Sequence, residues 1–112
     1  MTAKDDKDKS RTAHILLSTY EAEYKKRHKK KPILNRYSAK WGMLDVIDSV
    51  GGERARELIE YYFHTGSEHS IEFFYRNFDK LDVTLSQIRE DRRRRAKILE
   101  ETRKMVEEAR NQ

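Results

Sequence analysis

The clearest chemical signal in the sequence is a run of seven residues that contains six cations and no acid. The six cations are Lys25, Lys26, Arg27, Lys29, Lys30 and Lys31. Cations this close repel one another unless carboxylates or a polyanion lie nearby. A nucleic-acid backbone is such a polyanion, and contact with it releases counterions. The run predicts phosphate binding, and the alternative is a solvated helix end whose cations complement the helix dipole.

A second group of cations lies toward the C-terminus and is diluted by acids. It consists of Arg92, Arg93, Arg94 and Arg95, which follow Glu90 and Asp91. We expect a second phosphate-binding patch here, although the neighbouring acids also fit an ordinary solvated helix face. Two further cations, Arg36 and Lys40, follow the first run and join the predicted nucleic-acid-binding set.

Aromatic residues are dense in the middle third of the chain, and most of them are expected in the core. Tyr37, Tyr61 and Tyr75 lie at the edges of the apolar stripes, beside cations. Exposed rings stack on the bases of single strands. Tyr37 and Tyr75, together with Trp41, are therefore the predicted base-stacking residues.

Residues for catalysis or metal binding form no recognisable pattern. The chain has no cysteine, so it has no thiol nucleophile and no thiolate metal site. His64 and His69 lie five residues apart, but a zinc site needs three or four ligands and no others accompany them. No Gly-rich phosphate loop and no nucleophile elbow is present. We expect a protein that is not an enzyme and that needs no metal or cofactor.

Composition limits the architecture to one small domain. The chain has 112 residues, of which 36% are hydrophobic and 40% charged, and its net charge is +5. No apolar run approaches the roughly 20 residues that span a bilayer, and the polar N-terminus does not resemble a signal peptide. We therefore expect a cytoplasmic protein without a membrane partner.

The spacing of hydrophobic residues and the positions of glycines and capping residues predict an all-α fold with a compact body of four short helices. A disordered lead-in over residues 1–9 precedes this body, which covers residues 10–81. The predicted helices begin at Ser10 or Thr12, after Asn35 or Ser38, at Glu53 and after Ser67, and they end near His28, Val50, His64 and Leu81. Gly51 and Gly52 separate the second and third helices, and Gly66 ends the third. A helix-turn-helix across Gly51 is disfavoured, because the reading helix would present a mixed set of charges to phosphates.

The last segment, residues 82–112, is predicted to be a long charged helix of the same domain. From Asp82 to Arg110 it has no glycine or proline, and 29 helical residues would extend about 43 Å. Apolar residues at heptad-like spacing form a seam that Arg92 and Arg95 interrupt. Such a helix could dock into the groove of a partner or pair with a copy of itself.

Three segments resemble helical parts of small bacteriophage-encoded proteins associated with DNA replication. They are NRYSAKWGMLDVIDSVG (Asn35–Gly51), ELIEYYF (Glu57–Phe63) and HSIEFFYRNFDKL (His69–Leu81). The resemblance implies a protein in the cytoplasm of an infected bacterium, working near nucleic acid or near the replication or transcription machinery. It carries no residue-level functional map.

The residues and the resemblance together predict a non-enzymatic accessory protein that binds nucleic acid, with DNA favoured over RNA. The alternative is a protein-binding adaptor or inhibitor that uses the long helix. The resemblance would direct such an adaptor to the host replication or transcription machinery. A homo-oligomer formed through the same helix is also compatible with the seam.

Overall fold

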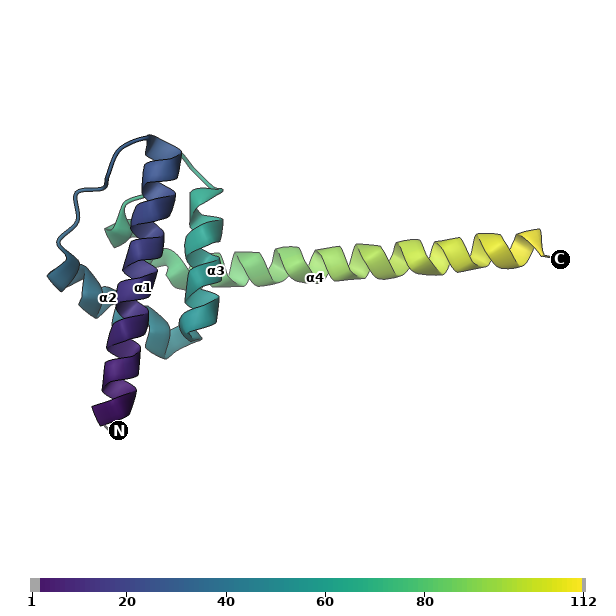
Figure 1. Ribbon diagram of the computed structural model, residues 1–112. Coiled ribbons are helices and arrows are strands. Elements are labelled where there is room, and N and C mark those ends of the chain that lie inside the picture. Colours follow the sequence, from purple (N-terminus) through teal and green to yellow (C-terminus); the bar gives the residue numbers. More distant parts are fainter. Residues whose placement is uncertain (1–2, 112) are drawn as a thin grey trace. The chain divides into compact units, whose positions relative to one another are not determined.

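The computed structural model describes residues 3–111, and every regular element in this range is an α-helix. The helices are α1 (Ala3–His28), α2 (Arg36–Val50), α3 (Gly52–Phe63) and α4 (Ile71–Arg110) (Figure 1). The all-α prediction is confirmed, but there are four helices where five were expected. None of the helices in the described range is both long enough and apolar enough to cross a membrane.

The predicted fourth helix and the predicted C-terminal helix form one continuous element, α4. The expected break at Leu81 rested on a change in composition, and composition alone does not end a helix. No glycine or proline occurs between Ile71 and Arg110, so every residue can continue the helical hydrogen-bond pattern. By its internal contacts the chain nevertheless divides into two compact units, one up to Leu81 and one from Asp82 onward.

A disordered lead-in was predicted for residues 1–9, whereas α1 begins at Ala3. Residues 1 and 2 lie outside the described range. The Thr12 hydroxyl does not cap the helix start; it donates to the Asp8 carbonyl four residues earlier, at 2.9 Å. The Lys9 Nζ lies 2.9 Å from an Asp48 carboxylate oxygen and thereby connects this part of α1 to α2. Lysine and alanine are good helix formers, so a polar segment can extend the helix.

Local capping signals locate the other helix ends. Asn35 caps α2, because its Oδ1 accepts from the Tyr37 and Ser38 amides at 3.1 and 3.2 Å. Of the two predicted caps, Asn35 is confirmed and Ser38 lies inside the helix. Gly51 ends α2 with φ +85°, a conformation that favours glycine. At α4 the cap is Ser70 and not the predicted Ser67, since the Ser70 Oγ accepts from the Phe73 amide at 3.2 Å.

The core of the first unit lies where α1 packs against both α2 and α3 (Figure 1). Its fully buried large side chains are Leu17, Tyr20, Met43, Val46, Leu58, Ile59, His69 and Phe74. Two buried tyrosines keep a hydrogen-bond partner for their hydroxyl groups. Tyr20 donates to the His69 carbonyl, and Tyr62 donates to the Ser70 carbonyl at 2.8 Å. Both bonds hold the segment before α4 against the body.

Gly42 in the middle of α2 allows close contact with an aromatic ring. A Cβ atom built at Gly42 would lie 2.3 Å from a ring carbon of Tyr75. The ring cannot easily move, because the Tyr75 hydroxyl donates to the Ala39 carbonyl at 2.6 Å. Burial raises the pKa of the Tyr75 phenol, so the hydroxyl remains a donor. This contact holds the part of α4 that belongs to the first unit against α2.

Gly42→Ala is expected to destabilise the protein, although alanine is the better helix former. Overpacking costs about 1–3 kcal/mol, whereas the gain in helix propensity is at most about 1 kcal/mol. Thermal unfolding should therefore occur at a lower Tm. The double variant Gly42→Ala/Tyr75→Leu should lose less stability than the two single variants added together. An unchanged or higher Tm for Gly42→Ala would contradict the close contact.

Candidate nucleic-acid interface

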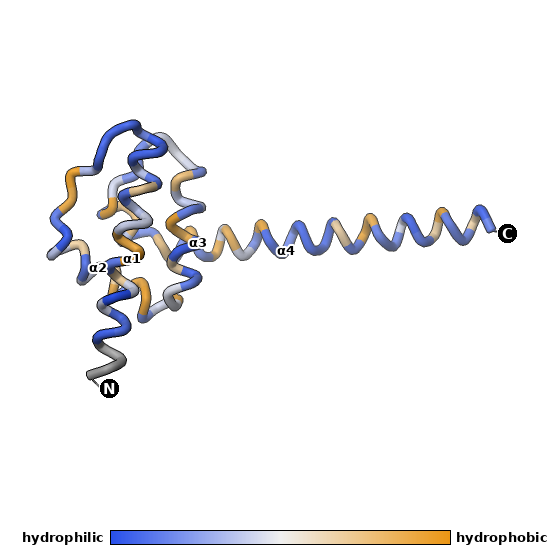
Figure 2. The backbone as a smooth tube through the Cα atoms, in the orientation of Figure 1, coloured by the Kyte–Doolittle hydropathy of each residue, from blue (hydrophilic) through white to orange (hydrophobic). Residues whose placement is uncertain are grey.

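The first run of cations lies at the C-terminal end of α1 and in the loop that follows. Lys25, Lys26 and Arg27 belong to the last turn of the helix, where the dipole favours positive charge. Lys29 then takes φ +62°, the left-handed conformation that ends many helices, and its amide donates to the Lys25 carbonyl at 2.8 Å. Figure 2 shows this end of α1 and the start of the loop as one hydrophilic stretch.

The six cations of this run have no carboxylate partner among the described residues. All six are exposed, and the polar contact found for their side chains is a long hydrogen bond, 3.5 Å, from Arg27 to the Gly66 carbonyl. Arg56 on α3 shows the contrast, because it lies between Glu53 and Glu60 at 3.8 and 3.2 Å. The protein thus neutralises cations elsewhere but leaves this run uncompensated.

Two hollows adjoin the run. One, of about 350 Å³, is lined by Lys30 and Lys31 together with the aromatic ring of Tyr24 and one glutamate, Glu72. The other, of about 330 Å³, is lined by Lys26 and Arg27 together with two glutamates. The side with Lys30 and Lys31 is therefore the more favourable one for an anion.

Arg36 and Lys40, the two further cations of the predicted set, lie on α2. The Arg36 guanidinium pairs with the Glu21 carboxylate of α1, and it also donates to the His14 carbonyl at 3.2 Å. Glu21 compensates the charge of Arg36, and the guanidinium N–H groups connect α2 to α1. Both properties are typical of a residue that stabilises the fold. Lys40 is half-buried on the same helix.

The three predicted stacking residues differ in accessibility. Tyr37 and Trp41 are exposed, with relative accessibilities of 76% and 57%, and their rings form an edge-to-face pair at 6.4 Å. Tyr75, by contrast, is half-buried, because its ring packs on Gly42 and its hydroxyl donates to the Ala39 carbonyl. Its position at the edge of an apolar stripe did not reveal this contact with α2.

The second group of cations, Arg92 to Arg95, lies in the unit from Asp82 onward. All four side chains are exposed on α4. Arg94 lies 3.5 Å from a Glu90 oxygen, one helical turn earlier, and both side chains of this pair are about two-thirds exposed. An exposed pair of this kind adds little stability and does not neutralise the group.

A hydrogen-bonded histidine pair, which the sequence did not predict, holds the end of α1. The His28 Nε2 lies 2.9 Å from the Nδ1 of the buried His69, and the His69 Nε2 lies 2.6 Å from the Thr65 carbonyl oxygen. A carbonyl only accepts, so the Nε2 of His69 carries a hydrogen. In neutral His69 the Nδ1 is then an acceptor, and His28 donates to it.

Protonation of His28 is disfavoured at this position. Desolvation lowers the pKa of His28, and the nearby charges of His69, Arg27 and Lys30 act in the same direction. The unfolded chain therefore binds more protons than the folded protein in the pH range below about 6.5. Stability is fully present above that pH and falls as the pH drops toward the lowered pKa.

His28→Gln is expected to flatten this dependence, because glutamine does not titrate but can still donate a hydrogen bond. Chemical denaturation at a series of pH values between about 5 and 7.5 measures the effect. The unmodified protein should lose stability toward the acidic end more steeply than the variant does. Parallel curves for the two proteins would mean that His28 has an ordinary pKa.

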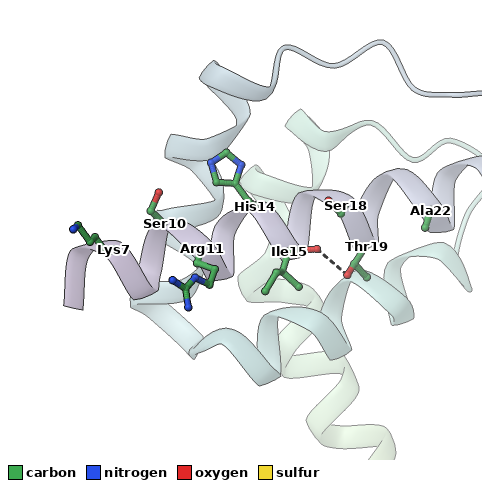
Figure 3. A pocket seen from close by; sticks show the side chains of 8 residues that line it. All are labelled: Lys7, Ser10, Arg11, His14, Ile15, Ser18, Thr19 and Ala22. Atoms are coloured by element: carbon green, nitrogen blue, oxygen red, sulfur yellow. Dashed lines mark hydrogen bonds between the residues drawn. The ribbon is translucent and has the colours of Figure 1, made fainter. Parts of the chain in front are cut away.

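One further hollow, of about 790 Å³, lies along α1 away from the basic run. Figure 3 shows that its lining residues all come from one side of this helix, from Lys7 to Ala22. Lys7 and Arg11 are the cations in it, and Ile15 is exposed there. Among the described residues no three His, Asp or Glu side chains gather into a group that could hold a metal ion.

Comparison of the chain with protein-family models, with curated proteins and with solved structures finds no match.

Proposed function

We propose that this protein is a non-enzymatic accessory protein that binds nucleic acid, with DNA favoured, through phosphate contacts from the end of α1. The residues in contact are the six cations of the first run, with Lys29, Lys30 and Lys31 at the centre. Arg92 to Arg95 provide a second set of phosphate contacts. Tyr37 and Trp41 stack on bases when the strand is single.

The uncompensated charge of the first run is the observation that supports this proposal. Six exposed cations within seven residues have no carboxylate partner in the part of the chain that the structure describes, although the sequence carries 20 acids. The helix dipole stabilises cations at this end by less than about 1 kcal/mol each, which does not cancel their mutual repulsion. A phosphate backbone would remove the repulsion and release counterions at the same time.

Lys29→Gly separates a loss of binding from a loss of folding. Glycine adopts the left-handed conformation of this position without steric cost, so the free energy of unfolding should stay unchanged or rise by up to about 1 kcal/mol. The variant lacks one phosphate contact. We therefore expect weaker binding to DNA of any sequence, and a slope of log affinity against log salt that is smaller by about one.

The matched control is Arg56→Gln, which also removes one positive charge but takes it from a compensated site on α3. It should leave the salt slope unchanged. Binding is measured between about 50 and 200 mM salt with single-stranded and duplex DNA. No affinity at the low salt concentration, or equal effects of the two variants, would overturn the phosphate proposal.

Trp41 provides a separate test of base stacking, because it is the one tryptophan in the chain. Trp41→Ala should weaken binding to single-stranded DNA by about 1–3 kcal/mol, whereas Trp41→Phe, which keeps a ring, should restore most of the affinity. Duplex binding should be nearly unaffected, since the bases are stacked on one another. If all three proteins bind single strands equally, Trp41 does not stack and the contacts are made with phosphates alone.

The adaptor or inhibitor remains the second candidate function because of one observation on α4. Leu99 and Met105 are 70% and 68% exposed, and large apolar side chains with this exposure are typical of surfaces that another protein covers. The DNA titration distinguishes the two candidates, since an adaptor of this kind needs no affinity for nucleic acid.

A further inference from the structure

The end of α4 is a long helical segment that nothing covers within its own unit. Every described side chain from Arg89 to Asn111 is exposed. Four of these side chains are large and apolar, namely Ile98, Leu99, Met105 and Val106, with relative accessibilities of 55%, 70%, 68% and 50%. Figure 2 shows isolated hydrophobic positions along this otherwise hydrophilic part of α4. A helix in a protein gains most of its stability by packing against other elements. This exposed segment lacks such a contact within its own unit.

The four apolar side chains lie on one face of the helix. Ile98 and Met105 are seven residues apart, and so are Leu99 and Val106, which is almost two turns in each case. The small residues Thr102 and Ala109 lie between these two rows, again seven residues apart. Arg93, Lys97 and Lys104 lie on the opposite face. The segment is amphipathic, and its apolar face is about one-third of its circumference.

Charged residues at this face determine the direction in which a second helix could pack. Arg95 lies in line with Thr102, in the middle of the face. In a parallel pair of identical helices, Arg95 would face Arg95 of the other copy in a site without solvent, which is costly. An antiparallel pair instead brings Arg95 beside the Leu99 side chain of the other copy, from where its guanidinium can extend to solvent.

Charged residues at the edge of the apolar face also favour antiparallel packing. Arg94 and Glu101 both border the side on which Ile98 lies. In an antiparallel pair with its two-fold axis close to Ile98, Arg94 of one copy faces Glu101 of the other, and this contact occurs twice. More broadly, residues 89–97 hold six cations and two acids, whereas residues 98–111 hold three cations and four acids. The two halves are therefore complementary in charge when the helices run in opposite directions.

We propose that this face of α4 binds a second copy of the chain, and that the two α4 segments pack antiparallel around Ile98. Ile98 and Leu99 form the apolar contact at the two-fold axis, and Arg94 and Glu101 pair across its edge. Met105 and Val106 lie toward the ends of the contact, opposite residues 89–91 of the other copy. The adaptor or inhibitor, the second candidate function, would use this same face of α4, and we propose a second copy of the chain as the protein that binds there. The proposed dimer does not depend on the nucleic-acid proposal, because dimerisation requires no DNA.

Single cysteines test both the dimer and its direction, because the chain has no cysteine of its own. Ile98 lies next to its counterpart in the antiparallel pair, so Ile98→Cys should form an intermolecular disulfide under mild oxidation. Ala109 lies on the same face but about 34 Å from its counterpart, and Ala109→Cys should stay monomeric on a denaturing gel. In a parallel pair Ala109→Cys would cross-link readily, and that result would overturn the proposed direction.

Light scattering across about a hundredfold concentration range tests whether the dimer forms without cross-linking. The unmodified protein should change from monomer to dimer as its concentration rises. Leu99→Asp should remain monomeric, and Lys104→Asp, a change on the opposite face, should dimerise like the unmodified protein. Both side chains are exposed, so neither change removes a buried contact from the body. A monomer at every concentration, together with no Ile98→Cys disulfide, would overturn the proposal whatever the result of the DNA titration.

Discussion

The position of the basic run depends on one buried side chain, His69. Its ring accepts a hydrogen bond from His28 on one side and donates to the Thr65 carbonyl on the other, while its own carbonyl accepts from Tyr20. These bonds join the last three turns of α1 to the segment between α3 and α4. The direction in which α1 ends, and with it the place where six cations leave the helix, follows from this network.

Aromatic packing surrounds the same network. The rings of Tyr62 and Phe63 lie 5.1 and 4.7 Å from the His69 ring, and Tyr24 lies 4.4 Å from His28. In this environment a charged imidazole is poorly solvated, which lowers the pKa of His28. The protein thus combines a tightly packed histidine pair with a group of cations within a few residues of it. Those cations form no ion pair with a described carboxylate, and the proposed phosphate contacts would compensate their charge.

The two units of the chain use their charges in different ways. In the first unit Arg36 of α2 pairs with Glu21 of α1, so its charge contributes to the packing of the body, whereas Arg56 pairs with Glu53 and Glu60 of its own helix α3. From Arg89 onward, the ion pairs found, Arg94 with Glu90 and Arg103 with Glu100, lie within one helix and are largely exposed. Pairs of this kind support the helix by a few tenths of a kcal/mol each but do not anchor it to anything. The apolar face is therefore the feature of that segment that can bind another molecule most strongly.

Local features of the sequence determined the three helices of the body and the charge of the basic run. Asn35 supplies a cap from its own side chain and Gly51 supplies a positive φ, and neither effect needs a distant partner. Tertiary structure decided what depends on residues far apart in the chain. The burial of Tyr75 on Gly42, the compensation of Arg36 by Glu21 and the contact of His28 with His69 each join residues from different helices. Spacing along one helix reports which residues share a face, but it does not report what packs against that face.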